Sequence, residues 1–502
     1  MFGRKPGSFR VNQLTIVNQD RDPVVITNIV SDLKLYEGIL HPFIKGRLTV
    51  VDSVGILENY KLVGQESLTI DVDSRLEGKS EGANFRKVFR IYAIDNVVGD
   101  SVKKTKTYRL HICDPKMMVV KTRRLNKTLR GSYSSMLLQV LQDDAGFRLQ
   151  RDLNKTADYW EETEPTNLQI VCPGWTIEKF IEVVRSEAVK KSTDNSYAQN
   201  MFFYQTMNGS FRFCSFDTMV SELEEPISFD MNTRSDVDVS EVDPDLPGFG
   251  EKTEILGMIQ PKRADVLQGA TSGAFASKQI TYDPIRKITE EFVYRITDSF
   301  GKSSNSHVSK APLINPEDME ITYGAKNVTG TGELAFELEE EFVDFAPKDR
   351  VESYVKFDVN PTNAFSDEAK LIDTNSKETK TQQLGFEKRN TGDLQRRAML
   401  SSINQNQTNV TVPFRTDLSV GTTVKLNFPT FKVDNEDDTK DELQDNTYLI
   451  TNIRYHMMPV DNEGALTLTC VKESFAKPVK GHRPLDKIES GVVGENWCFI
   501  MV

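Results

Sequence analysis

The residues that most often do chemistry in proteins are few and scattered in this chain. No two of the five histidines have the spacing of a metal-binding or catalytic motif; they are His41, His111, His307, His456 and His482. No two of the five cysteines have the Cys-x-x-Cys spacing of zinc or redox sites; they are Cys113, Cys172, Cys214, Cys470 and Cys498. Most of these cysteines lie in apolar, strand-like segments, which predicts reduced core residues. We expect no metal site and no cofactor site.

Carboxylates are the other candidates for catalysis, and the densest run of them is residues 337–341. Glycoside hydrolysis needs two carboxylates at a fixed separation on a rigid frame. This run lies in a polar stretch with little periodicity, which favours a solvated face over a catalytic pair. The sequence also contains no GxSxG elbow, no P-loop and no GxGxxG turn. We therefore expect no enzyme activity and no catalytic residue.

The elements that could position a site are mostly strands, and their pattern repeats near the two ends of the chain. The first copy comprises residues 62–72, 89–94 and 108–113, and the second comprises residues 419–428, 448–453 and 466–470. Each copy has a Val-Gly turn and three strands with the period-two alternation of half-buried β structure. Aligning them needs a one-residue insertion after the glycine. A duplicated unit predicts a subunit that presents two similar modules to a symmetric partner; a chance likeness of two antiparallel domains is the alternative.

Length and charge limit the possible classes of protein. A chain of 502 residues is long enough for three or four domains. The formal net charge of −12 argues against a surface that binds DNA independently of sequence, because such a surface needs a basic face. One basic cluster is interpreted as a solvated face; it comprises Lys121, Arg123, Arg124, Lys127 and Arg130. No secretion signal follows Met1 and no apolar run is long enough to span a bilayer, which predicts a cytoplasmic protein without stable membrane insertion.

Changes in periodicity divide the chain into five regions, and the predicted fold class is mainly β with an inserted α+β region. Residues 1–114 form the first β module, with strands at 14–17, 26–33 and 43–53. Residues 115–221 form a helical and hairpin region, whose hairpin is a candidate to join the second module. Residues 222–390 form the inserted region, which starts with a loop at 222–245 and contains an acidic excursion at 301–388. Residues 391–475 form the second β module after a helix at 391–405, and residues 476–502 form a tail.

Two helices and a hairpin are predicted in the helical and hairpin region. The first helix covers residues 134–143, with Ser134 or Ser135 as its N-cap and Gly146 at its end. The second begins after Thr176, a candidate N-cap. Asn-Gly at 208–209 between two aromatic-rich strands predicts a tight hairpin. Its aromatic stripe is interpreted as core packing and comprises Phe202, Tyr204, Phe211 and Phe213.

The C-terminal tail is polar but ends in an apolar tip. Large apolar side chains at the end of a polar segment favour docking on a partner or on the chain's own oligomer. The candidate partner-interface residues are Trp497, Phe499, Ile500 and Val502.

The order of these pieces resembles the central baseplate-hub proteins of tailed phages with contractile tails, which lie at the end of the tail tube. The resemblance is carried by residues 42–53, by Pro173-Gly174-Trp175-Thr176 with 200–204 and 209–213, by 275–287 with 300–302, and by 415–421 with 448–456. It covers nearly the whole chain apart from the acidic excursion and the tail. Each segment alone is weakly specific, and their order and spacing carry the resemblance.

The resemblance implies a homotrimer in which each protomer carries two tail-tube-like β-barrel or sandwich modules. Six modules would form a pseudo-sixfold ring that joins the hexameric tail tube protein to a trimeric central spike protein. The ring would enclose a channel through which DNA passes without specific binding, helped by the acidic charge. Further partners would be baseplate wedge proteins and a tape-measure protein. The protein would assemble in the host bacterial cytoplasm and reside in the virion tail baseplate.

Other classes of protein stay open at this point. The hub of a bacterial contractile injection or secretion system would share the fold, and genome neighbours would distinguish it. A receptor- or carbohydrate-binding tail protein would expose stacked aromatic residues, whereas the aromatic residues here alternate along strands. A tail enzyme is disfavoured by the missing acid–base motif. No lysozyme or needle segment is recognisable in the sequence, so the spike is expected to be a separate chain.

Overall fold

The computed structural model describes much of the chain in two compact units. The described residues are 10–18, 21–73, 84–100, 102, 104–149, 158–164, 166–191, 201–221, 226–231, 253–284, 287–299, 311–312, 354–359, 394–429, 446–461 and 463–475. One unit is built from residues within 1–191, 200–261 and 407–471. The other is built from residues within 192–199, 262–406 and 472–502.

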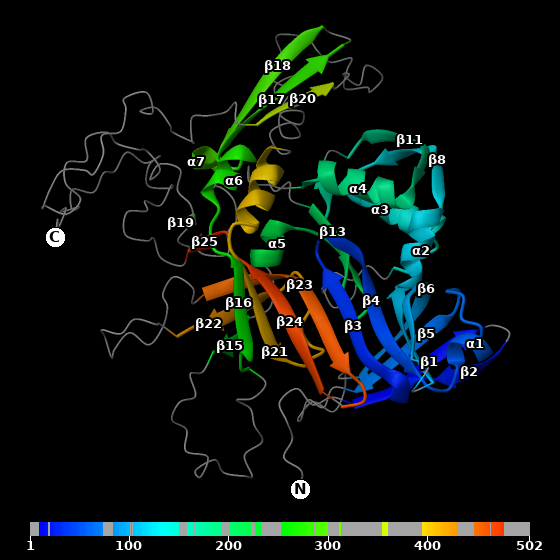
Figure 1. The fold of residues 1–502 in the computed structure, drawn as a ribbon. Coiled ribbons are helices and arrows are strands. Elements are labelled where there is room, and N and C mark those ends of the chain that lie inside the picture. The colour runs from blue at the N-terminus through cyan, green and yellow to red at the C-terminus, as the bar shows by residue number, and fades with distance from the viewer. Residues whose placement is uncertain are drawn as a thin grey trace, which may run out of the picture. The chain divides into compact units, whose positions relative to one another are not determined.

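The first unit contains a large, mostly antiparallel sheet, and the predicted mainly β fold class is confirmed (Figure 1). The first β module supplies β1 Arg10–Asn18, β2 Arg21–Val25, β3 Val30–Gly38, β4 His41–Asp52, β5 Ser67–Asp73, β6 Asn84–Asp100 and β7 Thr105–Cys113. The second supplies β21 Gln407–Pro413, β22 Thr423–Asn427, β23 Asn446–Met458 and β24 Glu463–Val471, with β15 Ile227–Asp230 and β16 Gly257–Lys262 added. Among the described residues, this sheet has 13 strands in the order β16-β21-β24-β23-β3-β4-β7-β6-β5-β1-β2, with β22 and β15 branching from β23.

The structure corrects two predictions about this sheet. The predicted strand at 26–33 begins only at Val30, because residues 27–29 form a 3-10 turn, η1. The side chain of Thr27 there accepts a hydrogen bond from the backbone N–H of Leu14 at 2.9 Å. The predicted loop at 222–245 contains the short strand β15, in which Ile227 and Phe229 pair in parallel with β22. A strand of four residues is too short to show a periodic signal in an acidic segment.

The helical and hairpin region follows β7 within the same unit. Its helices are α2 Pro115–Thr122, α3 Tyr133–Gln139, α4 Ile177–Glu187 and α5 Phe216–Ser221, with a π-helical turn η2 Val140–Asp144; α1 Ile56–Asn59 lies in the first module. Its strands are β8 Arg124–Gly131, β9 Tyr159–Trp160, β10 Thr163–Glu164, β11 Leu168–Thr176, β12 Val189–Lys190, β13 Met201–Gln205 and β14 Phe211–Ser215. The strands form three small sheets, β8–β11, β10–β12 and β13–β14–β9.

Side-chain capping explains where helices α3 and α4 of this region begin. Thr176 caps α4 as predicted, and its hydroxyl accepts the N–H of Lys179 at 3.2 Å. The prediction of Ser134 or Ser135 as the cap of α3 was wrong. Ser132 is the cap, and its hydroxyl accepts the N–H of Ser135 at 3.2 Å. Three serines within four positions are chemically equivalent candidates, so composition alone does not choose among them.

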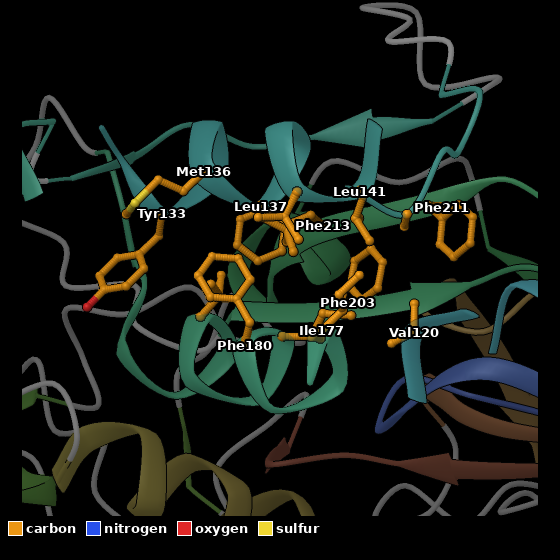
Figure 2. Close-up of a cluster of buried hydrophobic side chains, with 14 of the residues drawn as sticks. Val120, Tyr133, Met136, Leu137, Leu141, Ile177, Phe180, Phe203, Phe211 and Phe213 are labelled. Carbon is orange, nitrogen blue, oxygen red and sulfur yellow. The ribbon is translucent and has the colours of Figure 1, made fainter. Parts of the chain in front are cut away.

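The predicted hairpin is confirmed, and Phe203, Phe211 and Phe213 of its two strands lie in the core of this region. Strands β13 and β14 pair from Met201–Ser215 to Gln205–Phe211, and Gly209 takes a positive φ of 90° in the turn. The four residues of the predicted stripe are fully buried, namely Phe202, Tyr204, Phe211 and Phe213, but they do not form a single stripe. Phe211 and Phe213 belong to the core of this region, whereas Phe202 and Tyr204 alternate with Phe203 along β13 and lie outside that core. Figure 2 shows Phe203 and Phe213 of this hairpin beside side chains of helices α3 and α4.

The second unit has its own small sheet and core. It contains α6 Val266–Thr271, β17 Ala276–Asp283, β18 Ile288–Arg295, α7 Ile296–Ser299 and β20 Val355–Val359 in the sheet order β18-β17-β20. Residues 394–403 are helical, within the helix predicted at 391–405. The core is formed by Phe275, Tyr294, Ile296, Leu394 and Ala398. A separate short pair joins β19 Ala311–Pro312 to β25 Ser474–Phe475. In the part of the chain that is described, no helix is long and apolar enough to cross a membrane.

Candidate functional site

The two β modules have the same strand pairing in the same register. In the first module, β6 pairs with β7 through Arg90–Cys113 and Ile91–Ile112, and a bulge follows before Ala93–His111. In the second module, β23 pairs with β24 through Leu449–Val471 and Ile450–Cys470, and a bulge follows before Asn452–Thr469. The position before each bulge is an isoleucine. A shared bulge is strong evidence for duplication because bulges are specific features of a ladder.

The turn before β5 in the first module also matches the turn before β22 in the second module. Gly64 and Gly421 both have positive φ, 86° and 75°. Ile91 N–H donates to the carbonyl of Glu66 at 2.9 Å, and Ile450 N–H donates to the carbonyl of Thr422 at 2.9 Å. Strands β5 and β22 then pair with their partners from Ser67–Arg90 and Thr423–Leu449. The segment between the glycine and the strand is one residue longer after Gly64 than after Gly421, as the alignment of the two copies in the sequence predicts.

The two modules meet in one continuous ladder, which we call the module junction and define as the pairing of β3 with β23. It runs antiparallel from Gly38–Asn452 to Leu33–Met457. Ile39 N–H adds a bond to the carbonyl of Thr451 at 3.0 Å. Figure 1 shows β23, in orange, beside β3, in blue. A sheet thus runs from one module into the other without an open edge between them.

Glu37 is the buried acid of the module junction. Its side chain accepts hydrogen bonds from the backbone N–H of Val420 at 3.2 Å and from the hydroxyl of Tyr455 at 3.0 Å. The same Tyr455 hydroxyl lies 3.2 Å from the carbonyl oxygen of Leu418. Burial raises the pKa of Glu37 to about 7, although both hydrogen bonds act to lower it. A carboxyl group from the first module therefore fixes a turn and a strand of the second.

A second polar pair lies on the other face of the junction. His456 Nε2 lies 2.5 Å from Asp32 Oδ1, and Lys34 Nζ lies 2.8 Å from Asp32 Oδ2. Gly38 leaves the space that the Asn452 side chain occupies, since a Cβ on Gly38 would overlap Asn452 Oδ1. A side chain on Gly38 would therefore displace the Asn452 side chain at this end of the junction.

Asp114 connects the first module to the helical and hairpin region. It caps α2 by accepting the N–H of Lys116 at 2.9 Å, and its other oxygen accepts from Gln205 Nε2 at 2.8 Å. Lys87 Nζ lies 3.2 Å from the same oxygen. Burial lowers the pKa of Lys87, and the charge of Asp114 acts in the opposite direction. These contacts position the hairpin against the module, since Gln205 is the last residue of β13.

The residues that could do chemistry stay apart or buried. Of the five histidines, His111 lies 2.7 Å from Asp95 and His456 pairs with Asp32, both inside ladders of the sheet. Burial raises the pKa of the Cys214 thiol to about 12, which makes it inert. Four cysteines are free and buried as predicted: Cys113, Cys172, Cys214 and Cys470. Within the described ranges, no group of three or more His, Cys, Asp or Glu side chains could hold a metal ion.

The predicted basic face is largely exposed but is tied to neighbouring groups. Lys121 pairs with Glu178 at 2.6 Å and Lys127 pairs with Asp144 at 2.5 Å. Several sequence candidates lie outside the described residues. They are His307, His482, Cys498, the acidic run 337–341, and the tail residues Trp497, Phe499, Ile500 and Val502.

Sequence reasoning missed the module junction, and one local signal could have found it. Leu33, Leu35 and Glu37 alternate on one face of β3, and all three are buried. An acid at the third position of an apolar stripe indicates a buried carboxyl group with specific partners. Its partners could not be named, because they come from the opposite end of the chain.

No family model and no curated protein matches the sequence. Among solved structures, a tail protein from Neisseria meningitidis matches 94% of this chain and 98% of its own, with 9% identity and a TM-score of 0.47. A prophage tail protein from Listeria monocytogenes matches 95% and 99%, with 9% identity and a TM-score of 0.42. A type VI secretion component of E. coli, described as structurally similar to phage tail proteins, matches 93% and 79%, with 8% identity and a TM-score of 0.38. These tail proteins and this secretion component are what the fold of the chain is similar to.

Proposed function

We propose that this protein is a structural baseplate hub that forms a homotrimer and joins a hexameric tail tube to a trimeric central spike. The observation that carries the proposal is the equivalent register of β6–β7 and β23–β24, bulge included. A trimer of a chain with one module would offer only three copies of a contact to a sixfold tube. A chain with two equivalent modules places six, which resolves the mismatch of symmetry.

The channel through such a ring would carry the genome during ejection. A chain with a formal net charge of −12 presents no overall attraction to DNA phosphates. DNA would therefore slide through the channel without being held. In this proposal the protein acts as a connector and not as an enzyme, and it works in the virion tail.

The test is a mixture of the purified chain with the tail tube protein and the spike protein of the same genome, imaged by electron microscopy. We expect particles with a ring of six similar densities, a tube on one face and a spike on the other. Particles in which the chain binds around the outside of the tube, or binds neither protein, would contradict the proposal. The imaging also reports whether wedge proteins are needed, since they are absent from the mixture.

The apolar tip of the tail is proposed as part of the spike contact. The residues concerned are Trp497, Phe499, Ile500 and Val502. A chain truncated after Lys477 should keep its fold and its contact with the tube, and should lose spike binding. A control chain with four serines in place of these residues separates the apolar tip from the length of the tail. Unchanged spike binding in both variants would remove the tail from the proposal.

A further inference from the structure

The solvent face of the large sheet carries side chains in rows that cross the module junction. Neighbouring residues of a strand point to opposite faces, and residues paired between adjacent strands share a face. Leu33, Leu35 and Glu37 of β3 are buried on one face, so Lys34 and Tyr36 lie on the other, where both are half-buried. The rows run from β23 through β3, β4 and β7 to β6, and the first three of these strands lie side by side in Figure 1.

The first row crosses five strands and contains three cations. In order across the sheet it is Arg454, Tyr36, Lys45, Cys113 and Arg90. Lys45 and Arg454 are exposed, and Arg90 is half-buried. The row thus carries positive charge from both modules and contains no carboxylate.

The second row lies two residues further along each strand and contains two more cations. In order from β23 to β7 it is His456, Lys34, Arg47 and His111. Two residues of a strand span about 7 Å, which is the distance between the rows. We call the five Lys and Arg side chains of the two rows the cationic rows; they are Arg454, Lys45, Arg90, Lys34 and Arg47.

Four of the five charges in the cationic rows have no carboxylate partner. Arg454 and Arg90 donate hydrogen bonds to hydroxyl groups, at 3.0 and 2.9 Å. Arg47 lies over a tyrosine ring, 6.0 Å from its centre. Among the described residues, Lys45 has no hydrogen-bond or ion-pair partner, and Lys34 alone of the five pairs with a carboxylate, at 2.8 Å. The other four charges are not neutralised, so they remain available to an anion.

Acidic groups on the same face begin in the third row. Asp32 of β3, Asp95 of β6 and Glu463 of β24 lie there, around a single arginine of β7. The positive charge is therefore confined to one end of the face, beside the start of β4. His41 at that start is consistent with this, because burial and then nearby cations, the first of them Lys45, lower its pKa.

We propose that the cationic rows bind the phosphate backbone of duplex DNA without preference for its sequence. The inference goes beyond the proposed function, which asks only that DNA can pass, and it does not depend on the number of chains in the assembly. Lys and Arg side chains that contact phosphates supply most of the affinity in binding of this kind. The formal net charge of −12 does not describe this face, because charges more than about 10 Å away are largely screened at about 0.1 M salt.

The shape of the cationic rows favours a duplex over an acidic peptide. Five strands about 4.8 Å apart spread the first row over about 20 Å. A duplex presents one charge per about 1.7 Å of its axis, which gives about a dozen charges over this length. An extended peptide of this length has about six residues and would need an acid at nearly every position. It would also lose about 1–2 kcal/mol of backbone entropy per residue, whereas the duplex is already stiff.

Contacts of this kind are compatible with the passage of DNA. Phosphates are equivalent at every step along a duplex, so a protein that contacts only phosphates can slide along it. The acidic third row limits the contacts to the two cationic rows. DNA that meets this face would therefore be oriented by it and would stay free to move.

The test is the binding of short fluorescent DNA duplexes to the full chain, measured by anisotropy at neutral pH. Two duplexes of unrelated sequence are compared. We expect a Kd of about 10⁻⁴ to 10⁻⁶ M at physiological salt, equal for both sequences. Five phosphate contacts predict a slope of about −4 to −5 when the logarithm of the association constant is plotted against the logarithm of the salt concentration.

Two double variants compare the cationic rows with exposed cations of β8. One carries Lys45→Gln and Arg454→Gln, and the control carries Arg124→Gln and Arg130→Gln. All four side chains are exposed, and both variants lose two positive charges, so the net charge changes equally. We expect the first variant to bind DNA about tenfold more weakly, with a salt slope smaller by about 2, and the control to match the unchanged chain. Urea unfolding of both variants checks that they are folded.

The outcomes of this comparison decide the inference. Weaker binding by the first variant with an unchanged control supports it. No binding by the unchanged chain, an equal loss in both variants, or binding that prefers one sequence overturns it. Poly-glutamate that binds more tightly than the duplex at equal charge concentration also overturns it and assigns the rows to an acidic protein partner. The hub proposal is tested separately, because the first variant should still form the ring with the tube and spike proteins.

Discussion

Tyr455 and Glu37 lie 418 residues apart in the chain, and the Tyr455 hydroxyl donates a hydrogen bond to the Glu37 carboxyl group at 3.0 Å. One residue belongs to β23 and the other to β3, so this bond joins the two halves of a duplicated structure. It lies among buried apolar side chains at the module junction, including Leu35 and Leu418. The stability of the junction is therefore tied to the protonation and hydrogen bonding of a single acid.

The first prediction concerns the pH dependence of stability through Glu37. Its pKa rises from 4.5 to about 7 in the folded chain, so the folded state binds this proton more tightly than the unfolded state. The stabilisation is fully present below pH 4.5 and is lost as the pH rises through 7. A shift of this size corresponds to about 3 kcal/mol. We expect the Glu37→Gln variant not to lose this stability as the pH rises, when its free energy of unfolding is measured in urea at several pH values. The exposed variant Asp22→Asn should still lose it, and an unchanged pH profile in Glu37→Gln would contradict the account.

The second prediction is an energetic coupling between Tyr455 and Glu37. Tyr455→Phe should cost about 1–3 kcal/mol at pH 8, because it removes a donor from a buried carboxyl group. In the Glu37→Gln background the same change should cost less, with a coupling of about 1 kcal/mol. In the chain that keeps Glu37, Tyr455→Phe should also raise the pKa of Glu37 further, because the Tyr455 hydrogen bond lowers that pKa. Tyr36 lies next to Glu37 but points to the other face of β3, so Tyr36→Phe should be additive with Glu37→Gln.

The third prediction compares the two equivalent glycines. Gly64→Ala and Gly421→Ala each force a positive φ on a residue with a side chain, at about 1 kcal/mol. At Gly64 the new Cβ meets only ordinary contacts, the first of them Tyr92 at 3.6 Å. At Gly421 it would overlap the Tyr204 hydroxyl, which adds about 1–3 kcal/mol. Unfolding free energies should therefore rank Gly421→Ala as the more damaging change, and Tyr204→Phe should partly rescue it. Equal costs at the two glycines would refute the overlap.

The fourth prediction concerns the aromatic core between α3 and α4. The ring of Phe203 stacks on Phe211 with centroids 5.4 Å apart and contacts Trp160 at 5.9 Å. Phe203→Ala should lower the free energy of unfolding by about 3–5 kcal/mol. The exposed Val171 of β11 is a control, and Val171→Ala should change it by less than about 0.5 kcal/mol. Thermal unfolding of both variants gives the comparison, and a mild effect at Phe203 would mean that this core is loosely packed.

Local patterns predicted the elements of this fold far better than their partners. The Asn208-Gly209 hairpin and the Thr176 cap depend on residues that are neighbours in sequence, and both are found as predicted. The period-two strands of both modules are also local, and their shared register confirms the repeat. The junction of β3 with β23 depends on which distant strand fills an edge, and no periodic signal reports that. Glu37 shows the limit, because its position in an apolar stripe indicates a partner without naming Tyr455.

The central claim is that three chains, each with two equivalent modules, form the complete ring. The most direct test is the mass of the purified protein in solution, by light scattering after a sizing column, alone and with the spike protein of the same genome. The account predicts an oligomer of three chains of 56.9 kDa, formed alone or on addition of the spike protein. A chain that stays monomeric in both samples, or that forms stable dimers, would contradict it.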